Sequence, residues 1–287
     1  MFLEQKIYNQ IKRQFPIVAV ELLIINSDNN VLMLKRSNEP AKDSWWIPGG
    51  RILFGESKMD AAKRLLKDEC GINLLDIKEF TTVDYLVNNS TENYSQHIMS
   101  SVYQIKVSGF NIKIDNQSSE YSWRTPSEWL KYVNHDFLIN ILNQLESCQN
   151  SNVISFLNNG SVSNEKKLFI KPYLYSIIKS SMPVPCVDTL ILDNAGKILL
   201  VKRKNEPAKD KWFVPGGRVL FGEKRIDTAK RKLKEECGLE GEHYKEIGNF
   251  EMVVNANNRS YHYLTTVYKL TVTNNHVVLD EQGSDFS

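Results

Sequence analysis

This sequence lacks the features that mark several large classes of protein. No apolar run approaches the roughly 18 residues needed to cross a bilayer as a helix. The N-terminal segment alternates charged and bulky side chains, without the apolar stretch and small-residue cleavage site of a signal peptide. No sign of charge dominates, because 36 basic and 34 acidic residues give a net charge of +2. We therefore expect neither a membrane nor a nucleic acid as a partner, and anions must bind at local sites.

Cysteine is scarce, and its spacing excludes the common metal and redox motifs. The four cysteines, Cys70, Cys148, Cys186 and Cys237, form no CxxC pair. This favours buried free thiols over a metal or redox role. Together with the missing signal peptide, it predicts a reducing, cytoplasmic setting.

What the sequence does contain is an internal repeat. Residues 35–56, KRSNEPAKDSWWIPGGRILFGE, return at 202–223 as KRKNEPAKDKWFVPGGRVLFGE, with 17 of 22 positions identical. The match extends back to Tyr8 and Tyr175, and forward to the segments around His97 and His262. A repeat of about 140 residues is far longer than the period of solenoid proteins, so each copy should have its own core.

The repeat predicts two domains joined by a polar linker. We expect domain 1 at residues 1–147, the linker at 148–167 and domain 2 at 168–287. Domain 1 continues past Gln117 into a strand and a helix, whereas the second copy stops at Ser287, where that strand should begin. We therefore expect domain 2 to lack its C-terminal strand and helix, through truncation or because the domain does without them.

Each copy has the pattern of a mixed α/β (α+β) domain. In the first copy, apolar β-rich runs at 18–26 and 31–36 flank a polar turn and predict a hairpin. Pro48 and two glycines then mark a tight loop, and residues 57–70 have helical periodicity that ends at Gly71. Two more strands follow, so we expect a mixed sheet flanked by helices in each copy.

A glycine-led loop followed by an acidic helix occurs in both copies at the same spacing. The residues are Gly50, Glu56, Arg64, Asp68 and Glu69 in the first copy, and Gly217, Glu223, Arg231, Glu235 and Glu236 in the second. A loop carbonyl and helix carboxylates can form a hard oxygen shell for Mg²⁺, and Arg64 and Asp68, four residues apart, can pair. A merely solvated acidic face could explain one copy, but hardly two with the same flanking Pro-Gly-Gly-Arg.

The motif resembles the signature of the Nudix hydrolases, and NEPAKDxWxxPGGR resembles the GDP-mannose mannosyl hydrolase group within them. The resemblance implies two tandem Nudix-like α/β/α sandwich domains with mixed sheets. Ordinary Nudix enzymes place a metal-binding Glu directly after the motif Arg, whereas here that position holds Leu65 and Lys232. In the resembled group, this loss accompanies attack of water on the anomeric carbon of the sugar, with GDP as the leaving group.

The resemblance also implies ligands for Mg²⁺, with Mn²⁺ as an alternative. The loop glycine, the second helix glutamate and a distal Gln would hold the metal: Gly50, Glu69 and Gln117, and Gly217, Glu236 and Gln282. Arginines would counter the charge of the diphosphate, and an acidic residue on the first strand would hold substrate. These residues are Arg36, Arg51 and Glu21 in the first copy, and Arg203, Arg218 and Asp188 in the second. A further catalytic Tyr of the group is matched by Tyr263 but is Ile98 in the first copy.

One departure concerns the general base, because the group places a His directly after the distal Gln. Here that position holds Ser118 or Gly283, and neither can accept a proton near neutral pH. Three hypotheses follow: a slow hydrolase of GDP-mannose or a related GDP-hexose with a base from elsewhere, such as His135; a nucleotide-sugar-binding module; or a pyrophosphohydrolase that releases a nucleoside monophosphate. Members of the group form homodimers, so the two repeats are expected to pair as a pseudo-dimer, or the chain to homodimerise.

Overall fold

The computed structural model divides the chain into two compact units, which are described separately. The first unit comprises Tyr8–Ser161, and the second comprises Met1–Ile7 together with Val162–Ser287. The structure describes residues 3–73, 77–89, 91–109, 111–147, 154–155, 170–193, 195–206, 208–256, 258–272 and 276–287. Apart from residues 154–155, the expected linker at 148–167 lies outside these described residues, as does Cys148.

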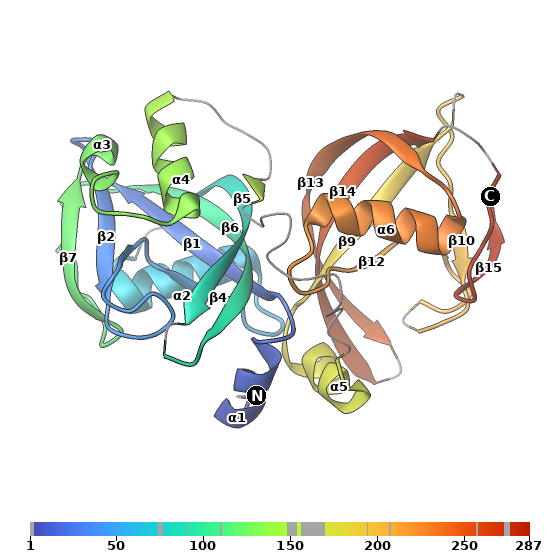
Figure 1. Ribbon diagram of the computed structural model, residues 1–287, viewed down its shortest axis with the longest axis horizontal. Helices are drawn as coiled ribbons and strands as arrows, with labels where there is room; N and C mark the ends of the chain where they lie inside the picture. Colours follow the sequence, from blue (N-terminus) through green and yellow to red (C-terminus); the bar gives the residue numbers. More distant parts are fainter. Residues whose placement is uncertain are drawn as a thin grey trace. The chain divides into compact units, whose positions relative to one another are not determined.

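The first unit is built on one mixed sheet (Figure 1). Strand β1 (Ile17–Ile25) lies at its centre, and every residue of β1 is buried. It pairs in parallel with β6 and antiparallel with β2 and β4, so the sheet is mixed as predicted. The other strands are β2 (Val31–Arg36), β3 (Trp45–Trp46), β4 (Gly49–Arg51), β5 (Lys78–Asn89), β6 (Tyr94–Lys106), β7 (Ser118–Arg124) and β8 (Ile154–Ser155).

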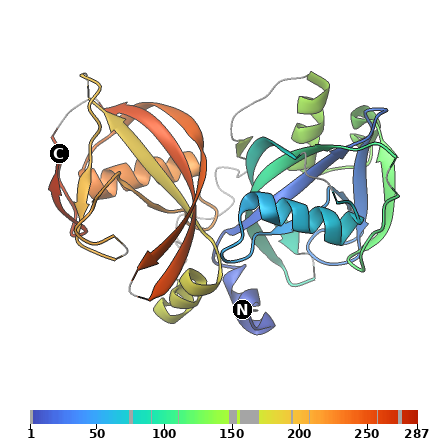
Figure 2. The ribbon, with the colours of Figure 1, turned by 180° about the vertical axis from the view of Figure 1, so that it is seen from behind.

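Helices complete the first unit. Helix α2 (Lys58–Cys70) lies across the sheet in the view of Figure 2. Helix α4 (Asp136–Ser147) lies in front of the sheet in Figure 1. Helix α2 begins where the Ser57 hydroxyl accepts the Asp60 N–H, and it ends at Gly71, whose φ of 67° suits glycine. These ends agree with the predicted helix at 57–70. The short helix α3 (Pro126–Trp129) also belongs to the first unit, whereas the short helix α1 (Gln5–Ile11) begins in the segment assigned to the second unit and ends in the first.

The second unit repeats this order of elements. Strands β9, β12, β14 and β13 form one sheet, and β10 pairs with β11 and β15 in another. Its core is formed by Ile191, Leu233, Cys237, Leu239 and Leu270. The elements are α5 (Pro172–Ser181), β9 (Val184–Leu192), β10 (Val201–Arg203), β11 (Trp212–Phe213), β12 (Gly216–Arg218), α6 (Arg225–Cys237), β13 (Gly241–Ala256), β14 (Arg259–Val272) and β15 (Gly283–Phe286).

The prediction that the second copy lacks its C-terminal strand is wrong. Gly283–Phe286 form β15, which pairs antiparallel with β10 in the way that β7 pairs with β2 in the first unit. The backbone groups of β10 need partners along that edge, and four residues are enough to supply them.

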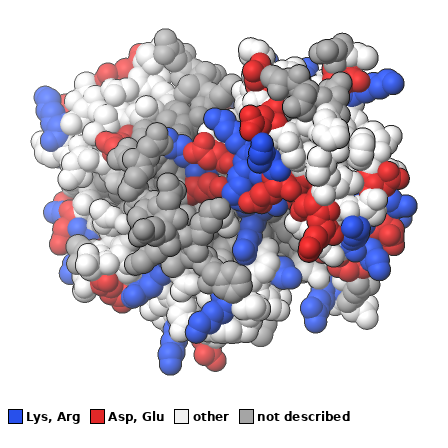
Figure 3. All heavy atoms as spheres, turned by 45° about the vertical axis from the view of Figure 1, so that its right-hand side comes forward, with Lys and Arg blue, Asp and Glu red and all other residues white. Residues whose placement is uncertain are grey.

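The described cysteines are free thiols, and surface charges of both signs occur together, as the sequence predicted. Cys70 and Cys237 are buried free thiols, and Cys186 is a half-buried one. Within the described ranges, no helix is both long enough and apolar enough to span a bilayer. On the face shown in Figure 3, acidic and basic side chains are intermixed.

Candidate functional site

The Gly-Gly loop of each unit is shaped by close contact with the first long strand. Gly49 pairs with Glu21, and Gly50 with Val20, across β4 and β1. A Cβ on Gly49 would overlap Glu21 Oε2 and lie 2.5 Å from the Val20 carbonyl oxygen. A Cβ on Gly50 would lie 2.9 Å from a methyl group of Leu65. Glycine is therefore required here because strand and helix approach the loop too closely for a side chain.

The motif arginine fastens the loop to helix α2. Arg64 donates to both carboxylate oxygens of Glu56, at 2.6 and 2.8 Å, and to the Arg51 carbonyl at 3.1 Å. Although burial acts to raise the pKa of Glu56, its bonds from Arg64 and the Leu53 N–H lower it overall. The predicted Arg64–Asp68 pair is therefore secondary to the bidentate bond with Glu56, which spans the loop and could not be read from helical spacing.

Glu69 turns towards the loop from the last turn of α2. Its Oε2 accepts the Gly49 N–H at 3.0 Å. Burial, and then the nearby Asp115 carboxylate, raise the pKa of Glu69 to about 7, against the effects of the Gly49 bond and of Arg36. Over the residues that the structure describes, Oε1 has no hydrogen bond or ion pair. One oxygen is thus held by the protein, and the other can accept a cation.

The distal Gln is held in place by the acidic residue two positions before it. Asp115 accepts the backbone N–H of Gln117 at 3.0 Å and its side-chain NH₂ at 2.9 Å. Because the amide nitrogen is used, the amide oxygen is left for a ligand. The sequence predicted Gln117 as a ligand, but the role of Asp115 in orienting its side chain required the structure.

Glu21 is a buried carboxyl group on β1, with 4% of its surface exposed. Its Oε1 accepts the Tyr85 hydroxyl at 2.6 Å, whereas Oε2 has no hydrogen-bond partner among the described residues. Burial raises the pKa of Glu21 to about 8; the Tyr85 bond opposes this, Glu69 adds to it, and Arg36 again opposes it. Glu21, Arg36 and Glu69 therefore lie within electrostatic range of one another. Tyr85, on β5, was not predicted as a site residue.

The two arginines of the first unit are positioned by different contacts. Arg36 Nε donates to the Pro40 carbonyl at 2.7 Å, which holds the guanidinium at the end of β2. The Arg51 guanidinium lies 4.6 Å from the centre of the Tyr8 ring. Such cation–π stacking restricts a long side chain while leaving its edge able to bind an anion. Tyr8 was matched to Tyr175 in the repeat, but its contact with Arg51 was not foreseen.

The two histidines of the first unit, His97 and His135, are buried or held by hydrogen bonds. Ser118 begins β7, opposite Arg36, at the expected position. His135, considered above as a base, has both ring nitrogens engaged: Nδ1 accepts the Phe137 N–H at 3.3 Å, so Nε2 donates to the Leu86 carbonyl at 3.0 Å. Burial lowers its pKa, and both ring nitrogens are held by backbone hydrogen bonds, so His135 has no ring nitrogen left to contact a water molecule. His97 is completely buried.

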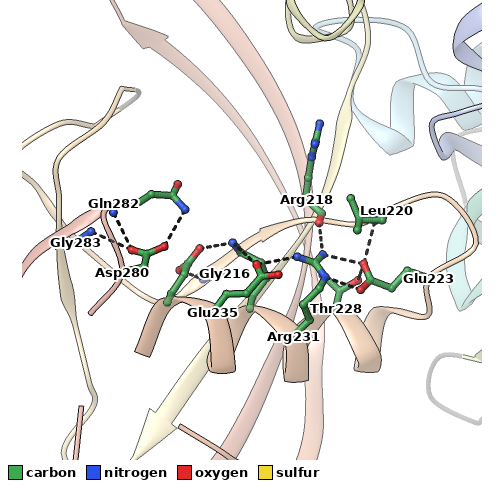
Figure 4. A network of polar contacts seen from close by, with 12 residues as sticks. Gly216, Arg218, Leu220, Glu223, Thr228, Arg231, Glu235, Asp280, Gln282 and Gly283 are labelled. Atoms are coloured by element: carbon green, nitrogen blue, oxygen red, sulfur yellow. Dashed lines mark hydrogen bonds and ion pairs between the residues drawn. The ribbon is translucent and has the colours of Figure 1, made fainter. Parts of the chain in front are cut away.

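The second unit reproduces most of this arrangement (Figure 4). Glu236 Oε2 accepts the Gly216 N–H at 3.0 Å, and Asp280 accepts the backbone and side-chain N–H groups of Gln282 at 2.8 and 3.0 Å. Arg231 makes the bidentate bond to Glu223, and it also pairs with Glu235 at 3.1 Å. The Arg–acid pairing expected from helical spacing is therefore present in this copy.

The substrate-binding residues predicted for the second unit also lie around its β9 strand. Asp188 accepts the Thr265 hydroxyl at 3.0 Å, and burial raises its pKa to about 6. The Arg218 guanidinium lies 4.4 Å from the Tyr175 ring centre, as Arg51 lies over Tyr8. The remaining two predicted residues are Arg203, 5.8 Å from the Phe213 ring centre, and Tyr263, on β14.

One residue makes the two sites chemically different. Lys232 occupies the position of Leu65, and its ammonium lies 2.7 Å from Glu236 Oε1 and 3.3 Å from Glu235 Oε2. Its side chain also lies where a Cβ on Gly217 would be, 2.6 Å from Lys232 Cε. The sequence showed that a carboxylate was missing here, but not that the lysine binds the predicted metal ligand.

The first unit offers a donor set that fits a hard divalent cation. In the described part of the chain, no three His, Cys, Asp or Glu residues converge as a metal cluster. The predicted oxygens are instead one carboxylate, one amide and one carbonyl, from Glu69, Gln117 and Gly50, which is a set that Mg²⁺ accepts. Besides burial, the Asp115 carboxylate raises the pKa of Glu69, and Glu69 raises the pKa of Glu21, so a cation beside Glu69 would be stabilised by the neighbouring carboxylates.

Comparison with known proteins identifies the family of this chain. The chain is 33% identical over 114 residues to the low-salt glycan biosynthesis protein Agl8 of Haloferax volcanii, covering 38% of this chain and 72% of that protein. It is 30% identical over 105 residues to an ADP-ribose pyrophosphatase of Methanocaldococcus jannaschii, covering 37% and 59%. Among solved structures, a MutT protein from Methanosarcina mazei Go1 matches with 22% identity and a TM-score of 0.41, over 47% of this chain and 95% of that one. The NUDIX domain model matches residues 16–144 and 182–284, so this chain belongs to the NUDIX domain family, with one copy of the domain in each half.

Proposed function

We propose that the first unit is a Mg²⁺-dependent hydrolase of nucleoside diphosphate sugars, with GDP-mannose or a related GDP-hexose as substrate. The reaction is attack of water on the anomeric carbon, which releases GDP and the free sugar. The observation that carries the proposal is the site around the Gly-Gly loop, where Glu69 is the helix carboxylate that faces the loop. Leu65, only 6% exposed, packs against Gly50 where a second carboxylate would stand in an ordinary pyrophosphohydrolase.

Gly50, Glu69 and Gln117 are the residues that would hold the metal. When bound, Mg²⁺ supplies Lewis-acid stabilisation of the charge that develops on the departing diphosphate. With one carboxylate in place of two, the site has less capacity for the additional ions that assist attack on phosphorus. Departure of GDP from carbon needs less metal, because negative charge accumulates only on the leaving group while the sugar becomes positive.

The two arginines supply the rest of the charge stabilisation. Arg36 is fixed by the Pro40 carbonyl, and Arg51 is supported by the Tyr8 ring. Guanidinium groups held in this way can bind diphosphate oxygens bidentately without reorganising during the reaction. Glu21, with a pKa of about 8, is mostly protonated at neutral pH and can donate a hydrogen bond to a substrate hydroxyl.

Turnover is expected to be slow, because Ser118 stands where the base would be and His135 is engaged in structural hydrogen bonds. A positioned general base contributes about 10²–10⁴-fold to a rate.

Two other functions have specific support. The 30% identity to an ADP-ribose pyrophosphatase favours attack on phosphorus, and the replacement of the base favours a nucleotide-sugar-binding module.

Product analysis in labelled water separates these functions. The full chain is incubated with GDP-mannose and Mg²⁺ in H₂¹⁸O, and products are identified by phosphorus NMR and mass spectrometry. We expect unlabelled GDP and ¹⁸O in the sugar, and loss of at least about 100-fold of the rate in Glu69→Gln, because this change removes the carboxylate charge. Labelled GMP or sugar phosphate would show attack on phosphorus and refute the proposal. Binding without turnover would identify a binding module.

A further inference from the structure

The two units differ at the residue that follows the motif arginine. In the first unit this residue is Leu65, which is buried against Gly50. In the second it is Lys232, whose whole residue is 9% exposed. The neighbouring hydrogen bond is the same in both, because Gly49 and Gly216 donate to Glu69 and Glu236 at the same distance, 3.0 Å. The difference is therefore one of charge at an otherwise matched position.

Lys232 forms an ion pair with Glu236 Oε1, the oxygen that corresponds to the open Glu69 Oε1 of the first unit. Glu236 Oε2 accepts the Gly216 N–H, and Glu236 Oε1 accepts the Lys232 ammonium at 2.7 Å. The side chains of this ion pair are only 11% and 16% exposed. Both oxygens of Glu236 are thus satisfied within the protein, whereas Glu69 Oε1 has no such partner among the described residues.

A divalent cation is strongly disfavoured at this position in the second unit. To reach Glu236 it would have to displace a poorly solvated ammonium, which would remain nearby as a like charge. Removing one partner of a buried ion pair leaves the other charge unpaired, which should weaken cation binding at Glu236 by at least about 100-fold. The metal-ligand role predicted for Gly217, Glu236 and Gln282 therefore does not fit this site.

The charges that remain suit an anion without any metal. Lys232 neutralises Glu236, and Arg231 pairs with Glu235, which leaves Arg203 and Arg218 with Asp188 as the remaining charged groups predicted to bind substrate. In the first unit, Leu65 brings no charge to Glu69 at the corresponding position. Glu69 thus presents a carboxylate oxygen to a diphosphate unless a cation covers it, whereas Glu236 is already paired.

We propose that the second unit is a metal-independent binding unit for a nucleoside diphosphate group, in which the Lys232 ammonium replaces the divalent metal of the first unit. The proposal deepens the proposed function, because it assigns metal-dependent hydrolysis to one unit only. Arg218, stacked on Tyr175, and Arg203 bind the phosphates, and Lys232 keeps Glu236 neutralised whether or not the ligand is bound.

The two units provide their own matched substitutions, Leu65→Lys and Lys232→Leu. Manganese binding to the full chain is counted by electron paramagnetic resonance. We expect one tight Mn²⁺ in the unmodified chain, none in Leu65→Lys and two in Lys232→Leu. Two tight sites in the unmodified chain, or no gain in Lys232→Leu, would overturn the proposal. Circular dichroism and thermal unfolding of each variant confirm that the count comes from folded protein, and a variant that unfolds is replaced by Leu65→Arg or Lys232→Met.

Calorimetry with GDP in the presence of EDTA tests the anion site. We expect one metal-free GDP per chain, with affinity falling at least about 10-fold in Lys232→Leu and recovering when Mn²⁺ is added. Equal metal-free affinity in Lys232→Leu would overturn the proposal. Failure of the proposed function is distinguishable, since it would appear as absence of nucleotide-sugar turnover while the Mn²⁺ and GDP counts still differ between the two substitutions.

Discussion

The buried carboxyl group of Glu21 should reduce the stability of the protein, and Glu21→Gln should therefore stabilise the ligand-free chain. Glu21 is 4% exposed, and burial raises its pKa from 4.5 to about 8. The folded state keeps the proton over a pH range in which the unfolded chain has lost it. Stability therefore falls as pH rises from about 4.5 to about 8.

The size of the effect follows from the two pKa values. At about 1.4 kcal/mol per pKa unit, the raised pKa of Glu21 costs less than about 1 kcal/mol at pH 5 and about 4 kcal/mol at pH 8. Glutamine resembles the protonated carboxyl group in shape and can still accept the Tyr85 hydroxyl. It should remove the pH-dependent cost while weakening substrate binding.

Urea unfolding in EDTA, at pH values from 5 to 8, measures the difference. Tryptophan fluorescence reports mainly on the first unit, which contains four of the five tryptophans: Trp45, Trp46, Trp123 and Trp129. Asp188→Asn is the control, because it removes the corresponding carboxyl group from the second unit and should leave this signal almost unchanged. The reasoning is refuted if Glu21→Gln lowers stability at pH 8, or if its effect is the same at pH 5.

Three further changes test other contacts. Arg64→Met should destabilise the first unit by about 3 kcal/mol, measured by urea unfolding, because it leaves the Glu56 carboxylate, 14% exposed, without its bidentate partner; an unchanged midpoint would contradict this. Asp115→Ala should weaken Mn²⁺ binding by about 10-fold in paramagnetic resonance titrations, since Gln117 loses two hydrogen bonds that orient it; unchanged affinity would mean that Gln117 is not a ligand. His135→Gln should leave the pH–rate profile unchanged within about threefold, because a structural histidine makes no contribution of the size of a general base; loss of one limb of the profile would identify it as a base.

The arrangement of the two repeats stays a prediction. A pseudo-dimer of the repeats would give a single compact particle in small-angle scattering, and a homodimer would double the mass in sedimentation equilibrium. Independent tumbling of two domains at monomer mass would contradict both.

The sequence by itself determined the duplication, the fold class and the loop–helix motif. These are readable because they depend on local rules: 17 of 22 identical positions, a Pro-Gly-Gly loop and a helix bounded by Ser57 and Gly71. The spacing from Gly50 to Glu69 was enough to indicate a metal site. It was not enough to show that Arg64 bonds to Glu56, because that contact joins a loop to a helix across eight residues.

Only the tertiary structure decided which groups surround each carboxylate. Tyr85 reaches Glu21 from a strand 64 residues away, and Tyr8 comes under Arg51 from a separate helix. The short β15 forms because β10 offers it an edge, which no local pattern in DEQGSDFS could indicate. Lys232 is the sharpest case. In the sequence it is one of two positions that lack the expected carboxylate, but in space its ammonium lies against Glu236, because a helical turn places residues four apart on the same face.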